Sequence, residues 1–438
     1  MIQCHEKLSL AESRLFIQAL SLNPGFFFLK TDSASFFSSH PFYKVSCKKG
    51  QVWGEKEGHS PHVISNDGFS CLPMLMKELS MPNLNPFFLA GAVGYIGYES
   101  ARFLPDFQHI PFHETPEDFH FGFYRHGLTL FDTHGELWWY GNDDWALSTK
   151  KNLSLNKKPL NPLQPLPTLT PDMTRQAYQN AFLAVQDAIT RGMAYQINLT
   201  SRWKFKSFYP SSAYWFYEQV SPEAKYGAVF STPERLICSW SPEKFVEIQG
   251  DRIETHPMKG TFLKTGQAAI DNKGLASFKE CKKNEAELTM IVDLLRHDLR
   301  KICKPGSVSV VDHQKIQAHA HVFQKTSVVS GTLNTSPIEA VISLLPGGSI
   351  TGAPKISAAE IIALLEPCAR DVYTGCIGYF GFNGNAHFNM AIRTAYSYEN
   401  CFYYHAGSGV TADSLLHQEW EEIEWKLKPF PFETNHGF

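Results

Sequence analysis

The chain has 438 residues, of which 43% are hydrophobic and 19% charged, and this composition predicts a soluble globular protein with a large core. A formal charge of −3 gives no basis for nucleic-acid binding. Nine cysteines without C-x-x-C spacing, no apolar signal segment in residues 1–12 and no run of 18 apolar residues indicate a reduced, cytoplasmic protein without a membrane span.

Residues 1–156 are expected to form a first region rich in strands. Short apolar and aromatic runs such as Phe26–Leu29 and Leu137–Tyr140 alternate with glycine and proline turns. The run Gly91–Glu99 predicts a strand and a turn with close backbone approach. Because no strand–loop–helix unit of the dinucleotide-binding type surrounds it, packing explains these glycines better than phosphate binding does.

A proline-rich segment separates this region from the rest of the chain. Residues 157–171 contain five prolines, a density that neither a helix nor a central strand accepts, so we interpret the segment as a linker. A second, catalytic region is expected over residues 172–430.

Three helices are predicted in this second region. Thr174 is the expected N-cap of a helix that ends near Arg191, before Gly192. Apolar residues at helical spacing predict two further helices, over residues 275–302 and 413–427. Strand-type runs lie between them.

Several glutamates of these helices lie beside apolar residues. Helical geometry places Glu287 on an apolar side, and Glu419 and Glu422 flank the apolar stripe of the last helix. A carboxylate beside a core is costly unless it is paired or bound to a metal, and carboxylates from two helices suit Mg²⁺. From spacing alone, a solvated acidic face is the simpler explanation, because Glu421 and Glu424 accompany them.

Seven short sequence segments, taken in their order along the chain, resemble those of a known enzyme family. They are Tyr195–Leu199, Ser241–Phe245, Thr255–Thr261, Glu287–Leu294, Gly347–Lys355, Ala391–Ala395 and Ala406–Ser414. Together they resemble the chorismate-utilising enzymes, the family of the anthranilate and aminodeoxychorismate synthases. The resemblance is strong from residue 172 to 427 and weaker before it. It implies an α+β fold in which two antiparallel sheets pack together, with helices outside and the active site in a cleft.

The resemblance also implies site residues. Three glutamates match those that hold Mg²⁺ against the ring carboxylate of chorismate: Glu287, Glu419 and Glu422. An arginine and a tyrosine match those that bind the enolpyruvyl carboxylate, and glycine N–H groups and a facing wall complete the substrate-binding set: Arg393, Tyr379, Gly407, Gly409, Gly348, Ser349 and Thr351. For Arg393, the sequence by itself favours a surface ion pair.

Lys259 indicates a branch of the family. Isochorismate- and salicylate-forming members add water and have a basic lysine where this chain has Gln196, which cannot deprotonate water. Anthranilate synthases usually have alanine at the position of Lys259. The resemblance therefore implies aminodeoxychorismate synthase component I. In that branch this amine attacks C2 of chorismate and the C4 hydroxyl leaves, and ammonia then attacks C4 and expels the lysine. Glu243 matches a glutamate proposed to handle the protons of the amine.

The expected product is 4-amino-4-deoxychorismate, a precursor of p-aminobenzoate and folate. A separate glutamine amidotransferase subunit is expected to supply ammonia, because no Cys-His-Glu glutaminase region is recognisable. The alternatives are anthranilate synthase component I and a non-catalytic chorismate-binding subunit, and a solvated turn is the simple alternative for Lys259. Gln324 stands where many relatives have a histidine proposed as the general acid, so that acid is left open, and the nearby His321 is not assigned.

Overall fold

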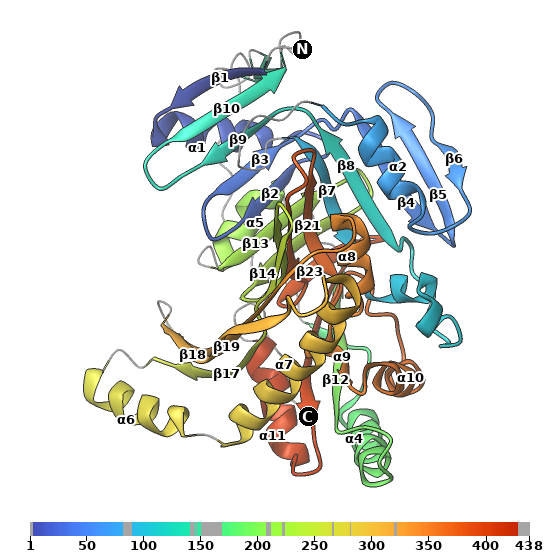
Figure 1. Cartoon of the computed structure of the whole chain (residues 1–438), viewed down its shortest axis with the longest axis vertical. Helices are drawn as coiled ribbons and strands as arrows, with labels where there is room; N and C mark the ends of the chain where they lie inside the picture. The colour runs from blue at the N-terminus through green and yellow to red at the C-terminus, as the bar shows by residue number, and fades with distance from the viewer. Residues whose placement is uncertain are drawn as a thin grey trace.

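Two large antiparallel sheets packed face to face form the centre of the molecule, and helices cover them on the outside (Figure 1). This arrangement confirms the expected α+β fold. The computed structural model describes residues 3–81, 90–140, 145–146, 148–149, 169–206, 212–220, 224–264, 267–280, 282–318 and 322–427.

The first sheet joins strands from both ends of the chain. Its order is β1-β10-β9-β3-β2-β13-β14-β23-β24-β12-β11, with β20 paired to β12. The strands are β1 (Gln3–Leu8), β2 (Phe27–Lys30), β3 (Ser35–Ser38), β9 (Gly127–Leu130), β10 (Gly135–Tyr140), β11 (Thr170–Pro171), β12 (Gln196–Lys206), β13 (Tyr226–Ser231), β14 (Leu236–Ser241), β20 (Gly352–Ala353), β23 (Thr394–Tyr398) and β24 (Cys401–Val410).

The second sheet also combines strands from the first and second regions of the chain. Its order is β17-β19-β16-β15-β22-β21-β7-β8-β4-β5-β6, with β18 paired to β19. The strands are β4 (Tyr43–Lys48), β5 (Gln51–Lys56), β6 (His62–Ser65), β7 (Gly91–Ile96), β8 (Phe119–Tyr124), β15 (Lys244–Gln249), β16 (Arg252–Thr255), β17 (Met258–Leu263), β18 (Ser309–Ala318), β19 (Val322–Thr332), β21 (Cys376–Gly381) and β22 (Ala386–Met390).

Helices close the two outer faces, and a third apolar cluster fills the space between the sheets. The first sheet packs against α1 (Leu10–Leu20), α4 (Arg175–Thr190), α5 (Ala213–Val220), α10 (Lys355–Leu365) and α11 (Leu416–Leu427). The second packs against α2 (Cys71–Glu78), α7 (Lys282–Ile302) and α8 (Pro337–Ser343). The remaining helices are η1 (Tyr98–Phe103), η2 (Pro105–Phe107), α6 (Ala268–Lys279) and α9 (Gly348–Thr351). None of the helices in the described ranges is long and apolar enough to span a membrane.

The predicted helices form, with one interruption. The hydroxyl of Thr174 accepts a hydrogen bond from the backbone N–H of Ala177 (3.2 Å) and caps α4 as expected. The helix predicted over residues 275–302 is instead two helices, α6 and α7, with a break at Glu280. The predicted apolar stripe of α7 is buried against the second sheet.

The strand β7 shows why the two regions of the chain cannot be separated. It lies between β21 and β8, so residues of the first and second regions share one sheet. A Cβ added at Gly94 would lie 1.8 Å from the carbonyl oxygen of His120, which confirms that this glycine serves close packing. Residues 157–168 of the expected linker lie outside the described residues.

Candidate active site

The chain passes from one sheet to the other at two adjacent places. A short segment ending at Glu243 joins β14 to β15, and residues 391–393 join β22 to β23. The backbone N–H of Met390 donates to the carbonyl oxygen of Glu243 (3.0 Å), and that of Trp240 donates to the carbonyl oxygen of Arg393 (2.9 Å). These backbone hydrogen bonds hold the two crossings, and the two predicted site residues they carry, next to each other.

Glu243 is a buried carboxyl group with little support for a negative charge. Glu243 is 6% exposed, and its Oε1 accepts a hydrogen bond from the hydroxyl of Ser349 (2.8 Å). Burial raises the pKa of Glu243 to about 7, although the Ser349 hydrogen bond and the charge of Lys259 act in the opposite direction. Both protonation states are therefore accessible near neutral pH, as a proton-transfer group requires.

Lys259 approaches the same serine from β17. Its ammonium group donates to the carbonyl oxygen of Ser349 (3.3 Å), and no carboxylate of the described residues is in direct contact with it. A β-bulge follows at Gly260, which has φ +75°, and bulges of this kind turn a side chain out of the regular alternation. The structure thus brings Lys259, Glu243 and Ser349 together around the start of α9.

A lysine that the sequence did not single out completes the positive charge of the cleft. Lys426, on α11, donates to the carbonyl oxygen of Gly407 (2.6 Å) and to the carboxylate of Glu422 (2.6 Å). Burial lowers its pKa, Glu422 opposes this, and the charges of Arg393 and Lys259 lower it further. Arg393 and Lys259 therefore both lie within electrostatic range of Lys426.

Arg393 is held in an unusual backbone conformation. Its φ is +51°, a left-handed value that is uncommon for residues other than glycine. Its guanidinium group lies 4.8 Å from the ring centre of Trp425, and its Nη1 donates to the carbonyl oxygen of Lys426 (3.4 Å). A site with three converging cations suits a small molecule that carries more than one carboxylate.

Two glycines of β24 lie where a side chain would collide with the neighbouring strand β12. Gly407 and Gly409 lie opposite Thr200 and Asn198 of β12. A Cβ added at Gly409 would lie 2.2 Å from the amide nitrogen of Gln196, so a larger residue would displace this buried amide. Gly348, Ser349 and Thr351 lie together in α9, where the Thr351 hydroxyl donates to the carbonyl oxygen of Gly347 (2.9 Å).

Known proteins share both the sequence and the fold. The chain matches the family described as chorismate binding enzyme over residues 27–431. It belongs to the chorismate binding enzyme family.

It is 32% identical over 357 residues to aminodeoxychorismate synthase component 1 of Bacillus subtilis (strain 168), covering 77% of this chain and 75% of that protein. It is 29% identical over 376 residues to anthranilate synthase component 1 of Saccharolobus solfataricus, covering 83% and 85%. The crystal structure of anthranilate synthase component I from Streptococcus pneumoniae TIGR4 superposes with a TM-score of 0.75 at 24% identity, covering 92% and 91%.

The glutamates expected to bind Mg²⁺ in this chorismate binding enzyme lie on two helices, Glu287 on α7 and the other two on α11. Glu419 is 3% exposed and accepts a hydrogen bond from the hydroxyl of Ser414 (2.7 Å), and Glu422, one turn further along α11, is paired with Lys426. The described residues contain no group of three or more His, Cys, Asp or Glu side chains arranged to hold a metal. Their hard oxygen donors are of the type Mg²⁺ prefers, and the metal site stays a prediction.

Tyr379 packs between the sheets. Its ring centre lies 6.0 Å from that of Phe36 and 6.3 Å from that of His387. Tyr373 lies within electrostatic range of Arg393: burial raises its pKa, while the charge of Arg393 is among those that lower it. Sequence reasoning missed Tyr373, because nothing in the spacing of the two tyrosines distinguishes them. The binding role of Tyr379 stays a prediction.

Gln324 is buried on β19 near the lysine. It lies opposite Thr261, two residues after Lys259 on β17, and is 6% exposed. An amide can donate a hydrogen bond to a leaving oxygen but cannot protonate it at neutral pH. His321 lies outside the described residues.

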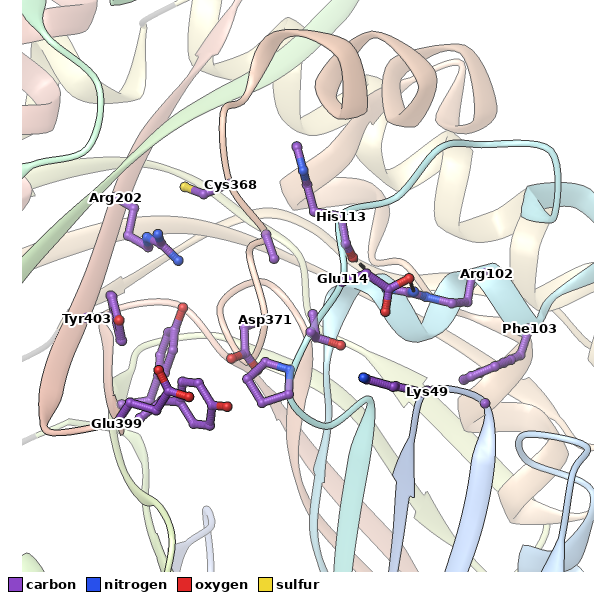
Figure 2. Close-up of a pocket in the computed structure, with 16 residues that line it drawn as sticks. Lys49, Arg102, Phe103, His113, Glu114, Arg202, Cys368, Asp371, Glu399 and Tyr403 are labelled. Carbon is purple, nitrogen blue, oxygen red and sulfur yellow. Dashed lines mark hydrogen bonds and ion pairs between the residues drawn. The ribbon is translucent and has the colours of Figure 1, made fainter.

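A cavity of about 940 Å³ lies elsewhere, and none of the predicted site residues line it (Figure 2). Its charged groups are largely paired within the protein. Arg202 donates to Asp172 (2.6 Å), and Arg102 forms an ion pair with Glu114 (3.7 Å). This cavity is therefore separate from the candidate active site.

Proposed function

We propose that this protein is component I of an aminodeoxychorismate synthase, which converts chorismate and ammonia to 4-amino-4-deoxychorismate and water. The observation that carries the proposal is Lys259, an amine that forms no ion pair with a carboxylate of the described residues and lies beside a carboxyl group whose pKa is about 7. A binding site alone has no use for an amine nucleophile next to a proton acceptor.

The residues of the cleft support a two-step displacement. Arg393 and Lys426 attract and orient the carboxylates of chorismate, and Lys259 attacks C2 as the bond between C4 and its hydroxyl oxygen breaks and the double bond shifts. Ammonia then attacks C4 and the bond from C2 to the lysine breaks, which restores the ring and frees the amine. Glu243 accepts a proton from the attacking amine and can return it, while Gln324 donates a hydrogen bond to the leaving oxygen.

We propose Mg²⁺ as the cofactor, held by Glu287, Glu419 and Glu422. A bound Mg²⁺ would neutralise the ring carboxylate of chorismate and fix its position. Because Glu422 is paired with Lys426, that lysine would exchange this partner for the substrate when the metal binds.

We further propose a glutamine amidotransferase as the partner that supplies ammonia, in the cytoplasm, on a route to p-aminobenzoate and folate. The name of the Bacillus subtilis relative, a component 1, supports a second component. The cysteines whose state the structure describes are free thiols, which fits a reducing compartment.

Product analysis tests the proposal. Purified protein is given chorismate, Mg²⁺ and a high concentration of ammonium, and aminodeoxychorismate is converted to p-aminobenzoate by added lyase. We expect p-aminobenzoate from the wild type and none from Lys259→Ala, whereas Lys315→Ala, which changes an exposed lysine on β18, should match the wild type. Without ammonium, the wild type should carry a covalent adduct on Lys259 whose added mass equals that of chorismate minus one water.

Fluorescent anthranilate from the wild type would favour the second candidate, anthranilate synthase component I, which the similarity to the Saccharolobus solfataricus protein supports. Chorismate binding without turnover at high ammonium would favour a non-catalytic subunit.

A further inference from the structure

One short segment separates the cavity of Figure 2 from the candidate active site. Cys368, Ala369 and Asp371 line the cavity, and Arg370 between them contacts residues of the cleft instead. Arg370 is 1% exposed and is among the largest fully buried side chains of the described residues. A buried arginine is costly unless its donors are hydrogen-bonded.

All three nitrogens of the Arg370 guanidinium group donate hydrogen bonds. Nε and Nη2 bind the two carboxylate oxygens of Glu366 (2.8 and 2.7 Å). Nη2 also donates to the carbonyl oxygen of Asn198 on β12 (2.7 Å), and Nη1 donates to that of Ile350 on α9 (3.0 Å). The ring of Tyr98 lies 4.7 Å beneath the group. One planar fork thus fixes two separate backbone segments relative to each other.

The two segments held by Arg370 are those that carry the cleft. Ile350 lies directly between Ser349, which binds Lys259 and Glu243, and Thr351. Asn198 lies opposite Gly409 in the sheet.

The carboxylate of Glu366 extends the same support. Its Oε1 accepts hydrogen bonds from both the backbone N–H and the hydroxyl of Thr200 (2.9 Å each), and Thr200 lies opposite Gly407. The carboxylate of Glu99 in turn holds the backbone N–H groups of Arg370 (2.7 Å) and Asp371 (2.9 Å). The position of the guanidinium group is therefore fixed from the backbone as well as from the side chain.

Stability alone does not explain this arrangement. Taking a buried ion pair out of water costs free energy that its attraction often only just repays, and an apolar pair of the same volume is frequently as stable. What an apolar pair cannot do is bind carbonyl groups of two different segments at defined distances. The specific gain from Arg370 is a defined separation between α9 and β12, the strand that pairs with β24.

We propose that Arg370 is a positioning residue for chorismate. It touches no substrate; it sets the distance between Ser349 on α9 and the Gly407–Gly409 segment of β24, which pairs with the β12 strand that Arg370 binds. The inference rests on the proposed function only for the identity of the substrate, and it does not depend on which product is formed.

Arg370→Lys tests the inference, with Arg235→Lys as its matched control. Arg235 is 4% exposed and forms a buried ion pair with Asp371 (2.6 Å), but its donors bind Tyr95 and Asp371 and no segment of the cleft. A lysine keeps the charge at either site and loses the planar fork. Both variants should lose thermal stability to a similar extent.

The two variants should differ in substrate handling. At a temperature where circular dichroism shows both folded, we expect Arg370→Lys to raise KM and the dissociation constant for chorismate by about tenfold and to lower kcat by about 10–100-fold. Arg235→Lys should leave all three within about twofold. The proposal is overturned if Arg370→Lys changes only the melting temperature, or if Arg235→Lys produces the same loss of affinity.

A milder variant keeps the test decisive if Arg370→Lys does not fold. Thr200→Val removes the hydroxyl that donates to Glu366 and leaves the ion pair intact. It should weaken chorismate binding by a few-fold, and unchanged binding would count against the proposal. Binding is measured directly by calorimetry, so a wild type that forms anthranilate would refute the proposed function and leave this comparison standing.

Discussion

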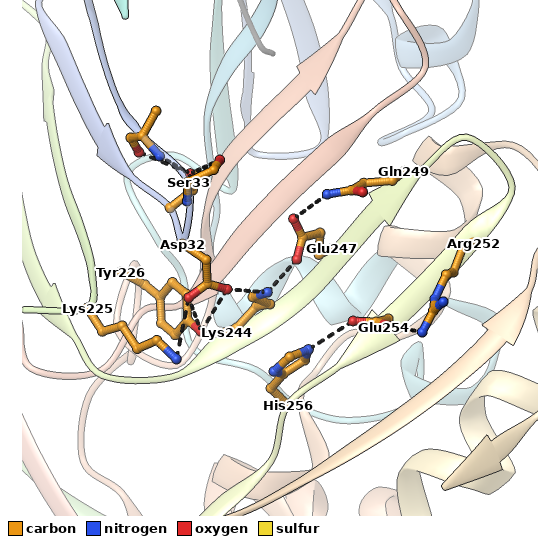
Figure 3. A network of polar contacts seen from close by, with 12 residues as sticks. Asp32, Ser33, Lys225, Tyr226, Lys244, Glu247, Gln249, Arg252, Glu254 and His256 are labelled. Carbon is orange, nitrogen blue, oxygen red and sulfur yellow. Dashed lines mark hydrogen bonds and ion pairs between the residues drawn. The ribbon is translucent and has the colours of Figure 1, made fainter. Parts of the chain in front are cut away.

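Two polar regions meet at the start of β15, and the protein treats their charges in opposite ways. Glu243 and Lys244 are adjacent, and successive residues near a strand point to opposite sides. Lys244 is 2% exposed and is paired with Asp32 (2.7 Å) and with Glu247 in an extended network (Figure 3). The carboxyl group of Glu243, by contrast, accepts a hydrogen bond from the neutral hydroxyl of Ser349.

The pKa values record the difference. Burial by itself would raise the pKa of Asp32, but the charges of Lys244 and Lys225 lower it to about 2. Burial raises the pKa of Glu243 to about 7, because the Ser349 hydrogen bond and the charge of Lys259 offset that effect only in part. Charges are therefore compensated where the structure needs a fixed ion pair and left under-compensated where a proton has to move.

Glu243→Gln should have the largest effect and should act on the reaction alone. The amide keeps the Ser349 contact and loses the proton acceptor, so we expect kcat to fall by about 10²–10⁴-fold. Glu247→Gln, in the paired network, is the matched control and should keep kcat within about twofold. Steady-state kinetics with chorismate and ammonium measure both variants, and equal losses would erase the distinction between the two regions.

The pH dependence of unfolding should show the same acid. The pKa of Glu243 is about 7 in the folded protein against an ordinary 4.5, so between these values the folded chain holds a proton that the unfolded chain releases. Glu243 should therefore contribute a fall in stability of roughly 3 kcal/mol as pH rises through this window, and this contribution should level off above pH 7. Urea unfolding at pH 5 and pH 8 measures the change.

Glu243→Gln should lack this contribution and keep that of Glu99, whose pKa burial raises from 4.5 to about 8. Asp32 does not interfere, because its lowered pKa makes stability fall only as pH drops below about 4 toward 2. A pH profile that is the same in the variant and the wild type would show that Glu243 does not titrate in this window.

Lys244→Met should destabilise the protein and spare the reaction. It leaves Asp32 and Glu247 without their shared cation, and we expect a loss of about 2 kcal/mol, less than for a fully buried pair because Asp32 is 43% exposed. The shift of the urea midpoint measures this loss. A fall in kcat comparable to that of Glu243→Gln would contradict the separation of the two regions.

Lys426→Met should give the smallest effect, since this lysine belongs to the cleft but is already paired with Glu422. Loss of one of three cations should raise KM for chorismate about tenfold and leave kcat within about threefold. Lys204→Met, at the 41% exposed lysine paired with Asp172, provides a control that should leave KM unchanged. A kcat effect larger than the KM effect would mean that Lys426 takes part in the chemistry.

The sequence predicted what depends on local pattern and on family resemblance. The capped helix at Thr174, the packed strand at Gly94 and the α+β fold all follow from such signals. The break at Glu280 did not, because the predicted helix continues without a proline or glycine there.

For the site, the motifs pointed to the residues that the structure places around Ser349, but not to those that hold them. Lys426 looks like an ordinary basic residue in the last turn of a helix. Arg370 acts through Asn198, which is 172 residues away in the chain, and through Glu99, which is 271 away. Contacts at such separations leave no periodicity or motif to read.

The position of β7 has a consequence for dividing the chain. A polypeptide that begins at residue 172 keeps every predicted catalytic residue, but it lacks β7 and β2, so β21 and β13 become open edges with buried apolar faces. It also lacks the carboxylate of Glu99 that holds the backbone of Arg370. Such a fragment should aggregate when produced alone and become soluble when the first 156 residues are produced beside it as a separate chain.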